Sequence, residues 1–301
     1  MDEGPPDSGA MAPLRVVRGP RFGLGREGAR SIAIALASTI VVFGALTWVV
    51  VNAPGWPRVQ QEFLDAENFA KSAPRIVEKF GVNVQLFLIS EVLILAWGLA
   101  LAVFRSVPGP VFFPLRILAT IYVDLFRALP GILVIFILGL GVPGLQIEGV
   151  PNDPFFWGVV ALTLLYSAYV SEVYRAGIES VHPSQAAAAR SLGLSQLQAL
   201  RYVVLPQAIR RVIPPLLNDF IGLQKDTVLV SFVGVVEVFR QSTIRQAATF
   251  NFTPFLVTAL IFLVVTIPLA RFTDWLLARQ GARMSSTRQG ATDRGRRIGA
   301  P

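Results

Sequence analysis

The chain contains no cysteine and only one histidine, His182, among its 301 residues. The absence of cysteine excludes a disulfide framework, a thiolate zinc site and a cysteine nucleophile. A single histidine cannot form a histidine cluster, and the phosphate-binding pattern G-x-x-x-x-G-K followed by Ser or Thr does not occur in the chain. The sequence therefore predicts no catalytic residue, no metal site and no cofactor held by this chain.

Charged side chains are scarce, at 15% of the residues, whereas hydrophobic residues make up 53%. The mean hydropathy of +0.58 is far from that of a soluble domain with a wet surface. Because a helix needs roughly 20 apolar residues to cross a bilayer, the charge-poor runs predict an all-α polytopic membrane protein with about six transmembrane helices. The predicted spans are residues 31–51, 84–104, 128–145, 155–171, 212–236, and 254–270 continued by 272–277.

Basic residues are unevenly distributed between the two sides of these spans. They are concentrated before residue 31, between Arg175 and Arg211, and after residue 270, and they are fewer in the segments on the other side. By the positive-inside rule, both termini are predicted to be cytoplasmic. The net charge of +8 indicates contact with anionic lipid rather than nucleic acid, because the basic residues flank spans. We predict a cytoplasmic disordered tail over 1–30, a membrane domain over 31–278 and a basic cytoplasmic tail over 279–301.

A loop over about 179–206, between the fourth and fifth spans, has the pattern of two short helices. Pro183 suits a first helical turn, and residues 185–192 are good helix formers. Gly193 is placed to take the left-handed conformation that ends a helix. Ser195 then caps a second helix, with Gln198 completing a capping box. The pattern predicts a helix, a glycine turn and a second helix, closed by Pro206.

The first of these helices is unusually rich in alanine, as its sequence Gln185-Ala-Ala-Ala-Ala-Arg190 shows. In a loop outside the bilayer no lipid can cover such small side chains, so they are predicted to press against another protein. A plain helical hairpin on the membrane surface remains an alternative on this evidence alone.

Several motifs resemble those of a known family. Gly193, nine intervening residues and then Val203-Val-Leu-Pro206 match the EAA loop of bacterial ABC-importer permeases. Further segments are similar to the polar amino-acid uptake subfamily, of the histidine and glutamine permease type, and the resemblance covers about residues 81–277. These segments are Tyr122-Val-Asp-Leu-Phe-Arg-Ala-Leu-Pro130, Glu172-Val-Tyr-Arg-Ala-Gly177, Leu205-Pro-Gln-Ala-Ile-Arg210 and Lys225-Asp-Thr-Val-Leu-Val-Ser231.

The resemblance implies the transmembrane domain of a type I ABC importer in the bacterial cytoplasmic (inner) membrane, taking up a polar amino acid. Its implied partners are an ABC ATP-binding subunit that binds and hydrolyses ATP, an external solute-binding protein, a second permease chain and the lipid bilayer, but no nucleic acid. The loop would seat in a groove of the ATP-binding subunit. Ala187 stands where the family usually has a glutamate. The implied docking residues are Ala187, Ala188, Ala189, Arg190, Gly193, Leu205 and Pro206.

Ionisable residues inside the predicted spans are candidates for a substrate path, because a charge facing lipid is costly. Asp219 and Asp226 are seven residues apart and share one helix face, with Asn218 beside it and Pro214-Pro215 predicted to break the helix below. Glu91 on the second span is a further candidate. These groups either line a translocation path or pair between helices and hold the bundle together, and the sequence leaves both interpretations open.

An ion-coupled secondary transporter is the alternative function. In that case Glu91, Asp219 and Asp226 would carry the coupling proton or sodium, and no ATPase would bind. Such folds show inverted repeats with interrupted helices in both halves. No other predicted span contains a second copy of the Pro214-Pro215 break, which favours the importer.

Overall fold

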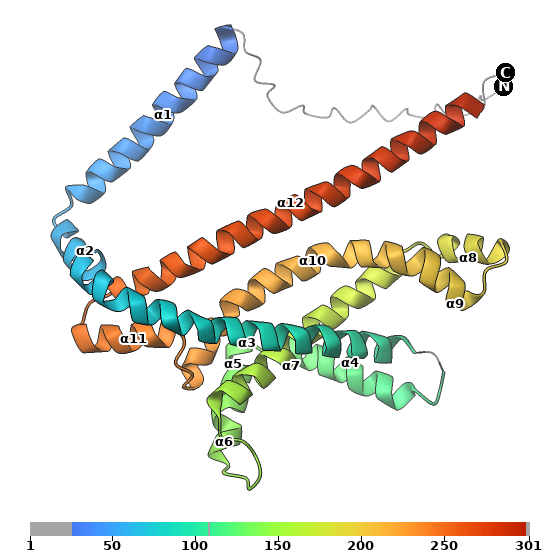
Figure 1. Cartoon of the computed structure of the whole chain (residues 1–301), viewed down its shortest axis with the longest axis horizontal. Coiled ribbons are helices and arrows are strands. Elements are labelled where there is room, and N and C mark those ends of the chain that lie inside the picture. Colours follow the sequence, from blue (N-terminus) through green and yellow to red (C-terminus); the bar gives the residue numbers. More distant parts are fainter. Residues whose placement is uncertain (1–25, 108, 299–301) are drawn as a thin grey trace, which may run out of the picture. The chain divides into compact units, whose positions relative to one another are not determined.

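The computed structural model describes residues 26–107 and 109–298, and side chains over 29–107 and 109–279 (Figure 1). Every regular element in these ranges is helical, so the prediction of an all-α fold is confirmed. Most of the tail predicted over residues 1–30 lies outside the described residues. The chain divides into two compact units, Met1–Val59 and Gln60–Pro301.

The first unit contains α1 (Arg26–Val51) and the start of α2 (Trp56–Phe63). Within α1, the 23 residues Ala29–Val51 are long and apolar enough to cross a membrane, and none of their most apolar window is buried. This is the first predicted span. An apolar helix without a covering protein surface is suited to lipid on all sides.

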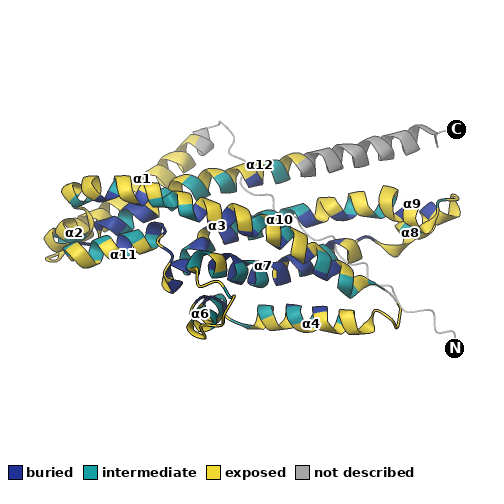
Figure 2. Cartoon of the chain, turned by 60° about the horizontal axis from the view of Figure 1, so that its bottom comes forward, coloured by how far each residue is buried: buried dark blue, intermediate teal, exposed yellow. Residues whose placement is uncertain are grey.

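The second unit is built on α3 (Ala66–Ser106) and α7 (Pro154–Glu179), which pack along each other (Figure 1). Each helix begins at an aspartate that accepts hydrogen bonds from two backbone N–H groups of its first turn, Asp65 for α3 and Asp153 for α7. Leu86 and Ile94 of α3 and Leu162 of α7 are almost completely buried between them. Figure 2 shows the buried residues gathered where α3, α7 and α10 meet.

The predicted third span is not one straight helix. It is formed by α5 (Gly131–Phe136), a π-helical turn η1 (Ile137–Gly141) and α6 (Val142–Gly144), and it is bent by 107° from the preceding α4 (Phe113–Ala128). The cause is Pro130, because a proline disfavours the helical conformation of the residue before it. Leu129 is accordingly extended, with ψ 138°. The predicted start at residue 128 is therefore wrong, since that residue ends α4.

The predicted fifth span is also divided. It consists of α10 (Leu205–Asp226) and a 3-10 helix η3 (Thr227–Val233), and it meets α11 (Val238–Thr249) at a bend of 49° after the left-handed Gly234. The predicted helix break at Pro214-Pro215 is wrong, since α10 runs through both prolines. Packing against α7 and α12 keeps this segment helical although two N–H donors are missing.

The last element, α12 (Thr253–Ile298), joins both parts of the predicted sixth span in one helix and continues through residue 298 into the predicted basic tail. Its membrane-compatible part is Thr253–Arg279. In the part of the chain that the structure describes, four helices are suited to cross a membrane, or up to six if each bent pair is one span. The upper number agrees with the sequence prediction.

A buried carboxylate network, formed by Glu237, Asn83 and Thr227, connects three elements of the second unit. Glu237 is fully buried and caps α11 by accepting from the backbone N–H groups of Phe239 and Arg240, at 3.0 and 2.7 Å. Asn83 of α3 donates through Nδ2 to Glu237 at 2.9 Å and to Thr227 of η3 at 3.1 Å. The network therefore holds the bend between η3 and α11 against α3.

Candidate functional site

The alanine-rich loop (residues 179–206) folds largely as its pattern predicts. Its first helix, α8 (Pro183–Ser191), begins after His182, whose Nδ1 accepts from the backbone N–H of Ser184 at 3.2 Å. Gly193 follows the helix with φ +90°. Its N–H donates to the carbonyl of Arg190 at 3.0 Å. The predicted helix end at a left-handed glycine is confirmed.

The second helix of the loop begins with the predicted capping box. The Ser195 N–H donates to Gln198 Oε1 at 2.8 Å, and the Gln198 N–H donates to Ser195 Oγ at 3.3 Å. The helix consists of α9 (Gln196–Ala199) and a π-helical turn η2 (Leu200–Val204), and it leads directly into α10. The prediction that Pro206 closes this helix is wrong. Pro206 lies in the first turn of α10, where a missing N–H is tolerated.

The predicted docking residues differ in exposure. Ala187, Ala188, Arg190 and Gly193 are exposed on the first part of the loop, and Leu205 and Pro206 are exposed at its end. Ala189 is buried inside the loop and cannot contact a partner directly. Three large hydrophobic residues of the loop are also exposed, although they were not predicted as docking residues. They are Leu192, Leu197 and Tyr202. The sequence could have indicated them, because Leu192 directly precedes the glycine turn and Leu197 and Tyr202 follow it, in a loop otherwise rich in small and polar residues.

The alanine-rich loop is attached to the bundle at the end of α7. The side chain of Arg211 on α10 donates through Nη1 to the carbonyl of Ser180, the residue that ends α7. Glu172 accepts from Arg105 of α3 at 2.9 Å and pairs with Arg175, which lies one helical turn further along α7. Arg175 also pairs with Glu179 at 2.5 Å. These contacts fix the start of the loop to three helices.

Gly177 allows α7 and α10 to approach closely beside this attachment. A Cβ at position 177 would collide with Cγ2 of Val212 on α10. Gly177→Ala is therefore expected to lower stability by about 1–3 kcal/mol through overpacking, and Val212→Ala in the same chain should restore most of it. Thermal unfolding of the purified complex measures both. Gly81→Ala is the matched control, because no described residue lies within 4 Å of the added Cβ. Absence of rescue in the double variant would contradict the packing explanation.

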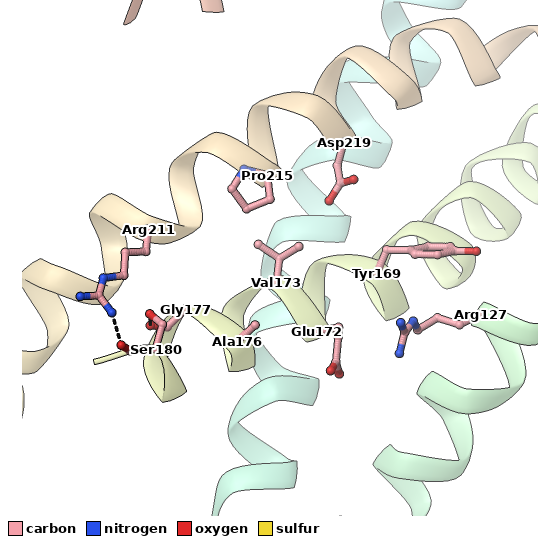
Figure 3. Close-up of a pocket in the computed structure, with 10 residues that line it drawn as sticks. All are labelled: Arg127, Tyr169, Glu172, Val173, Ala176, Gly177, Ser180, Arg211, Pro215 and Asp219. Carbon is pink, nitrogen blue, oxygen red and sulfur yellow. Dashed lines mark hydrogen bonds between the residues drawn. The ribbon is translucent and has the colours of Figure 1, made fainter. Parts of the chain in front are cut away.

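Two cavities lie between α7 and α10, and both are lined by Tyr169 and Asp219. The arginine cavity, of about 390 Å³, also has Arg127, Glu172 and Arg211 in its wall (Figure 3). In Figure 3, Asp219 and Arg211 come from α10, Tyr169 and Glu172 from α7, and Arg127 from α4. This cavity reaches Gly177 and Ser180, so it extends to the attachment of the alanine-rich loop.

The carboxylate cavity, of about 470 Å³, continues from Tyr169 and Asp219 to Asp226. Asp226 accepts a hydrogen bond from the hydroxyl of Tyr166 at 2.8 Å. Oδ2 of Asp219 is buried and has no hydrogen-bond partner among the described residues. The remaining wall is formed by Gly131 and three aliphatic side chains, Ile132, Leu165 and Leu229.

The structure brings only part of the predicted polar path together. Asp219 and Asp226 line the carboxylate cavity, as their spacing on one helix face predicts. Asn218 is exposed and Glu91 is partly buried, and neither lines the two cavities. Glu91 nevertheless lies within electrostatic range of Asp219. Tyr166, Tyr169 and Arg211 were missed, because single tyrosines and a loop-end arginine carry no distinguishing spacing.

Several of the described helices are suited to cross a membrane, and comparison with known proteins identifies the class of protein. The family model described as "Binding-protein-dependent transport system inner membrane component" matches residues 83–281. The chain belongs to this family of inner-membrane transport components. It is a multi-pass permease of the ABC type and not an enzyme, with ATP hydrolysis in a separate subunit. The ion-coupled alternative is set aside.

Individual relatives agree with this assignment. The chain is 39% identical over 183 residues to the "Probable glutamine ABC transporter permease protein GlnM" of Bacillus subtilis, covering 60% of this chain and 82% of the relative. It is 31% identical over 205 residues to the "Arginine transport system permease protein ArtQ" of the same organism, covering 68% and 91%. The predicted resemblance to polar amino-acid ABC permeases is confirmed.

The fold comparison gives the same result. A chain in the crystal structure of an amino acid ABC transporter with histidines superposes with a TM-score of 0.65. The two chains are 30% identical, and the match covers 71% of this chain and 98% of the other. The predicted fold class, the membrane domain of an ABC transporter, is therefore confirmed.

Proposed function

We propose that this permease imports a polar amino acid along the two cavities that meet at Asp219. The observation that carries the proposal is that the two cavities share Tyr169 and Asp219, so that their walls together reach from Asp226 to the attachment of the alanine-rich loop. The relatives support the substrate class, since their names specify glutamine and arginine transport.

The remaining parts of the transport system follow from the proposed mechanism. An external binding protein delivers the amino acid, and a separate ATP-binding subunit receives the exposed side chains of the alanine-rich loop, including Leu192 and Leu197. A second permease chain completes the pore, and both termini lie in the cytoplasm. Closure of the ATP-binding subunits moves the two loops and switches the pore between inward-facing and outward-facing states, as rigid-body alternating access requires.

The contact between Arg211 and the start of the loop supports this coupling. Arg211 contacts both the arginine cavity and the carbonyl of Ser180. A movement of the loop at Ser180 is therefore transmitted to a residue that lines the cavity. This contact gives the ATP-driven movement a direct route to the substrate path.

Asp219→Asn is expected to change substrate affinity or selectivity while the complex still assembles, because the amide keeps the shape of the side chain and removes its charge. Uptake of radiolabelled glutamine, arginine and histidine by the reconstituted complex measures the effect. We expect uptake of at least one of them to change about tenfold, because the variant loses one charge-assisted hydrogen bond to the substrate. Asp274→Asn, at an exposed position of α12 outside both cavities, is the control. Unchanged uptake of all three amino acids would assign Asp219 a structural role.

A further inference from the structure

The charges that line the carboxylate cavity are of one sign. Asp219 and Asp226 both belong to its wall, and among the described residues no lysine, arginine or histidine does. Lys225, next to Asp226 in the sequence, is exposed and lines neither described cavity. A ligand that fills this cavity therefore meets two acidic groups and no basic one.

The hydrogen bonds of these two carboxylates leave acceptor capacity unused. A carboxylate has about four lone-pair sites. Tyr166 donates to one oxygen of Asp226, and Oδ2 of Asp219 has no partner among the described residues. Burying acceptors without donors is unfavourable. The cavity is thus complementary to a ligand with several hydrogen-bond donors and positive charge.

The spacing of the two carboxylates favours a long ligand with two separate cationic groups. Asp219 and Asp226 are seven residues apart on α10, so their backbones are separated by about 10 Å along the helix axis. A basic amino acid carries an α-ammonium group and a cationic side-chain end, whereas a neutral amino acid carries the α-ammonium group alone. Each carboxylate can therefore pair with one cationic group of a basic amino acid.

The α-carboxylate of such a ligand finds its partner in the adjoining arginine cavity. Arg127 and Arg211 lie in that wall, and the cavity shares Asp219 with the carboxylate cavity. Glu172, the other acidic residue there, is neutralised by Arg105 and Arg175. An acidic amino acid would instead place its side-chain carboxylate against Asp219 or Asp226, and repulsion between like charges would disfavour its binding.

We infer that the carboxylate cavity selects amino acids with a cationic side chain, through Asp219 and Asp226. This inference rests on the proposed import path and adds its substrate class. Tyr166 acts as a positioning residue, because its hydroxyl holds Asp226. Gly222 leaves room for this tyrosine, since a Cβ there would lie 3.3 Å from the hydroxyl oxygen.

The test measures binding without the external binding protein, whose own selectivity would otherwise mask that of the permease. The complex of permease and ATP-binding subunit is purified, and equilibrium binding of radiolabelled arginine is competed with citrulline, glutamine and glutamate. Citrulline has nearly the shape of arginine but an uncharged side-chain end. We expect arginine to bind at least tenfold more tightly than citrulline and glutamine, which corresponds to a difference of about 1.4 kcal/mol in binding free energy. Glutamate should bind most weakly.

Variants assign the preference to the two carboxylates. Asp226→Asn is expected to reduce the ratio of arginine to citrulline affinity to about one third or less, and Tyr166→Phe should reduce it partly. Asp274→Asn is the matched control and should leave the ratio unchanged. If a variant fails to assemble, the comparison of arginine with citrulline on the unaltered complex still decides whether the permease selects by charge.

The possible outcomes separate this inference from the proposed function. Citrulline or glutamine binding as tightly as arginine would overturn selection by charge and leave a polar amino-acid path in place. An arginine preference that persists in both Asp219→Asn and Asp226→Asn would also overturn it. Binding of none of the four amino acids would contradict the path itself, and the inference with it.

Discussion

Gly193→Asp is expected to abolish transport while the membrane-spanning helices remain folded. Gly193 has φ +90°, where any residue with a Cβ costs about 1–2 kcal/mol. Among the described residues, nothing lies within 4 Å of the added Cβ. The side chain would therefore project from the exposed turn of the alanine-rich loop into the surface that we propose to contact the ATP-binding subunit. The resemblance implies a glutamate at the position of Ala187, so we expect fewer polar contacts there to compensate.

Two measurements test this expectation, namely co-purification of the ATP-binding subunit and uptake of labelled amino acid by the reconstituted complex. We expect the variant to retain its thermal stability to within about 2 kcal/mol, the strain at one left-handed residue, and to lose both association and uptake. Gly149→Asp is the matched control, because Gly149 also has positive φ, +82°, and open space around its Cβ. Normal co-purification and uptake by Gly193→Asp would show that this loop does not dock the ATPase.

The alanine-rich loop illustrates what the sequence can predict. The turn at Gly193 and the capping box of Ser195 and Gln198 depend on residues within a few positions of each other, so their pattern was sufficient. Pro206 and the pair Pro214-Pro215 were interpreted wrongly. Their effect depends on the helix position of Pro206 and on the packing of α10 against α7 and α12, neither of which is a local property of the sequence.

The candidate substrate path was predicted only where its residues share one helix. The seven-residue spacing of Asp219 and Asp226 correctly places them in one cavity wall. Tyr166 and Arg127 come from α7 and α4, and their approach to α10 depends on how the helices pack. Asn218 does not line this cavity, although it is adjacent to Asp219 in the sequence. Adjacent residues of a helix point about 100° apart, so Asn218 faces away from the side of Asp219. Periodicity thus identifies a helix face but not the residues opposite it.

Glu237→Ala is expected to cause the largest loss of stability among substitutions outside the proposed path. Glu237 is fully buried and accepts from the N–H groups of Phe239 and Arg240 and from Nδ2 of Asn83. Alanine leaves the buried Asn83 amide and the partly buried N–H groups of Phe239 and Arg240 with fewer acceptors, and a buried donor without a partner costs about 1–3 kcal/mol. We therefore expect a loss of about 3 kcal/mol or more, measured as a lower midpoint of thermal unfolding of the purified complex.

A second carboxylate cap, Asp153, separates the effect of burial from the effect of capping. Asp153 caps α7 with two similar backbone hydrogen bonds but is exposed, so Asp153→Ala should cost only about 1 kcal/mol. Glu237→Ala should also loosen the bend between η3 and α11, because Asn83 then keeps only its contacts to Thr227 and the N–H of Val238. Faster hydrogen exchange over residues 227–240 would report this loosening. If Glu237→Ala is no more destabilising than Asp153→Ala, the carboxylate acts only as a helix cap, and it does not hold η3 and α11 against α3.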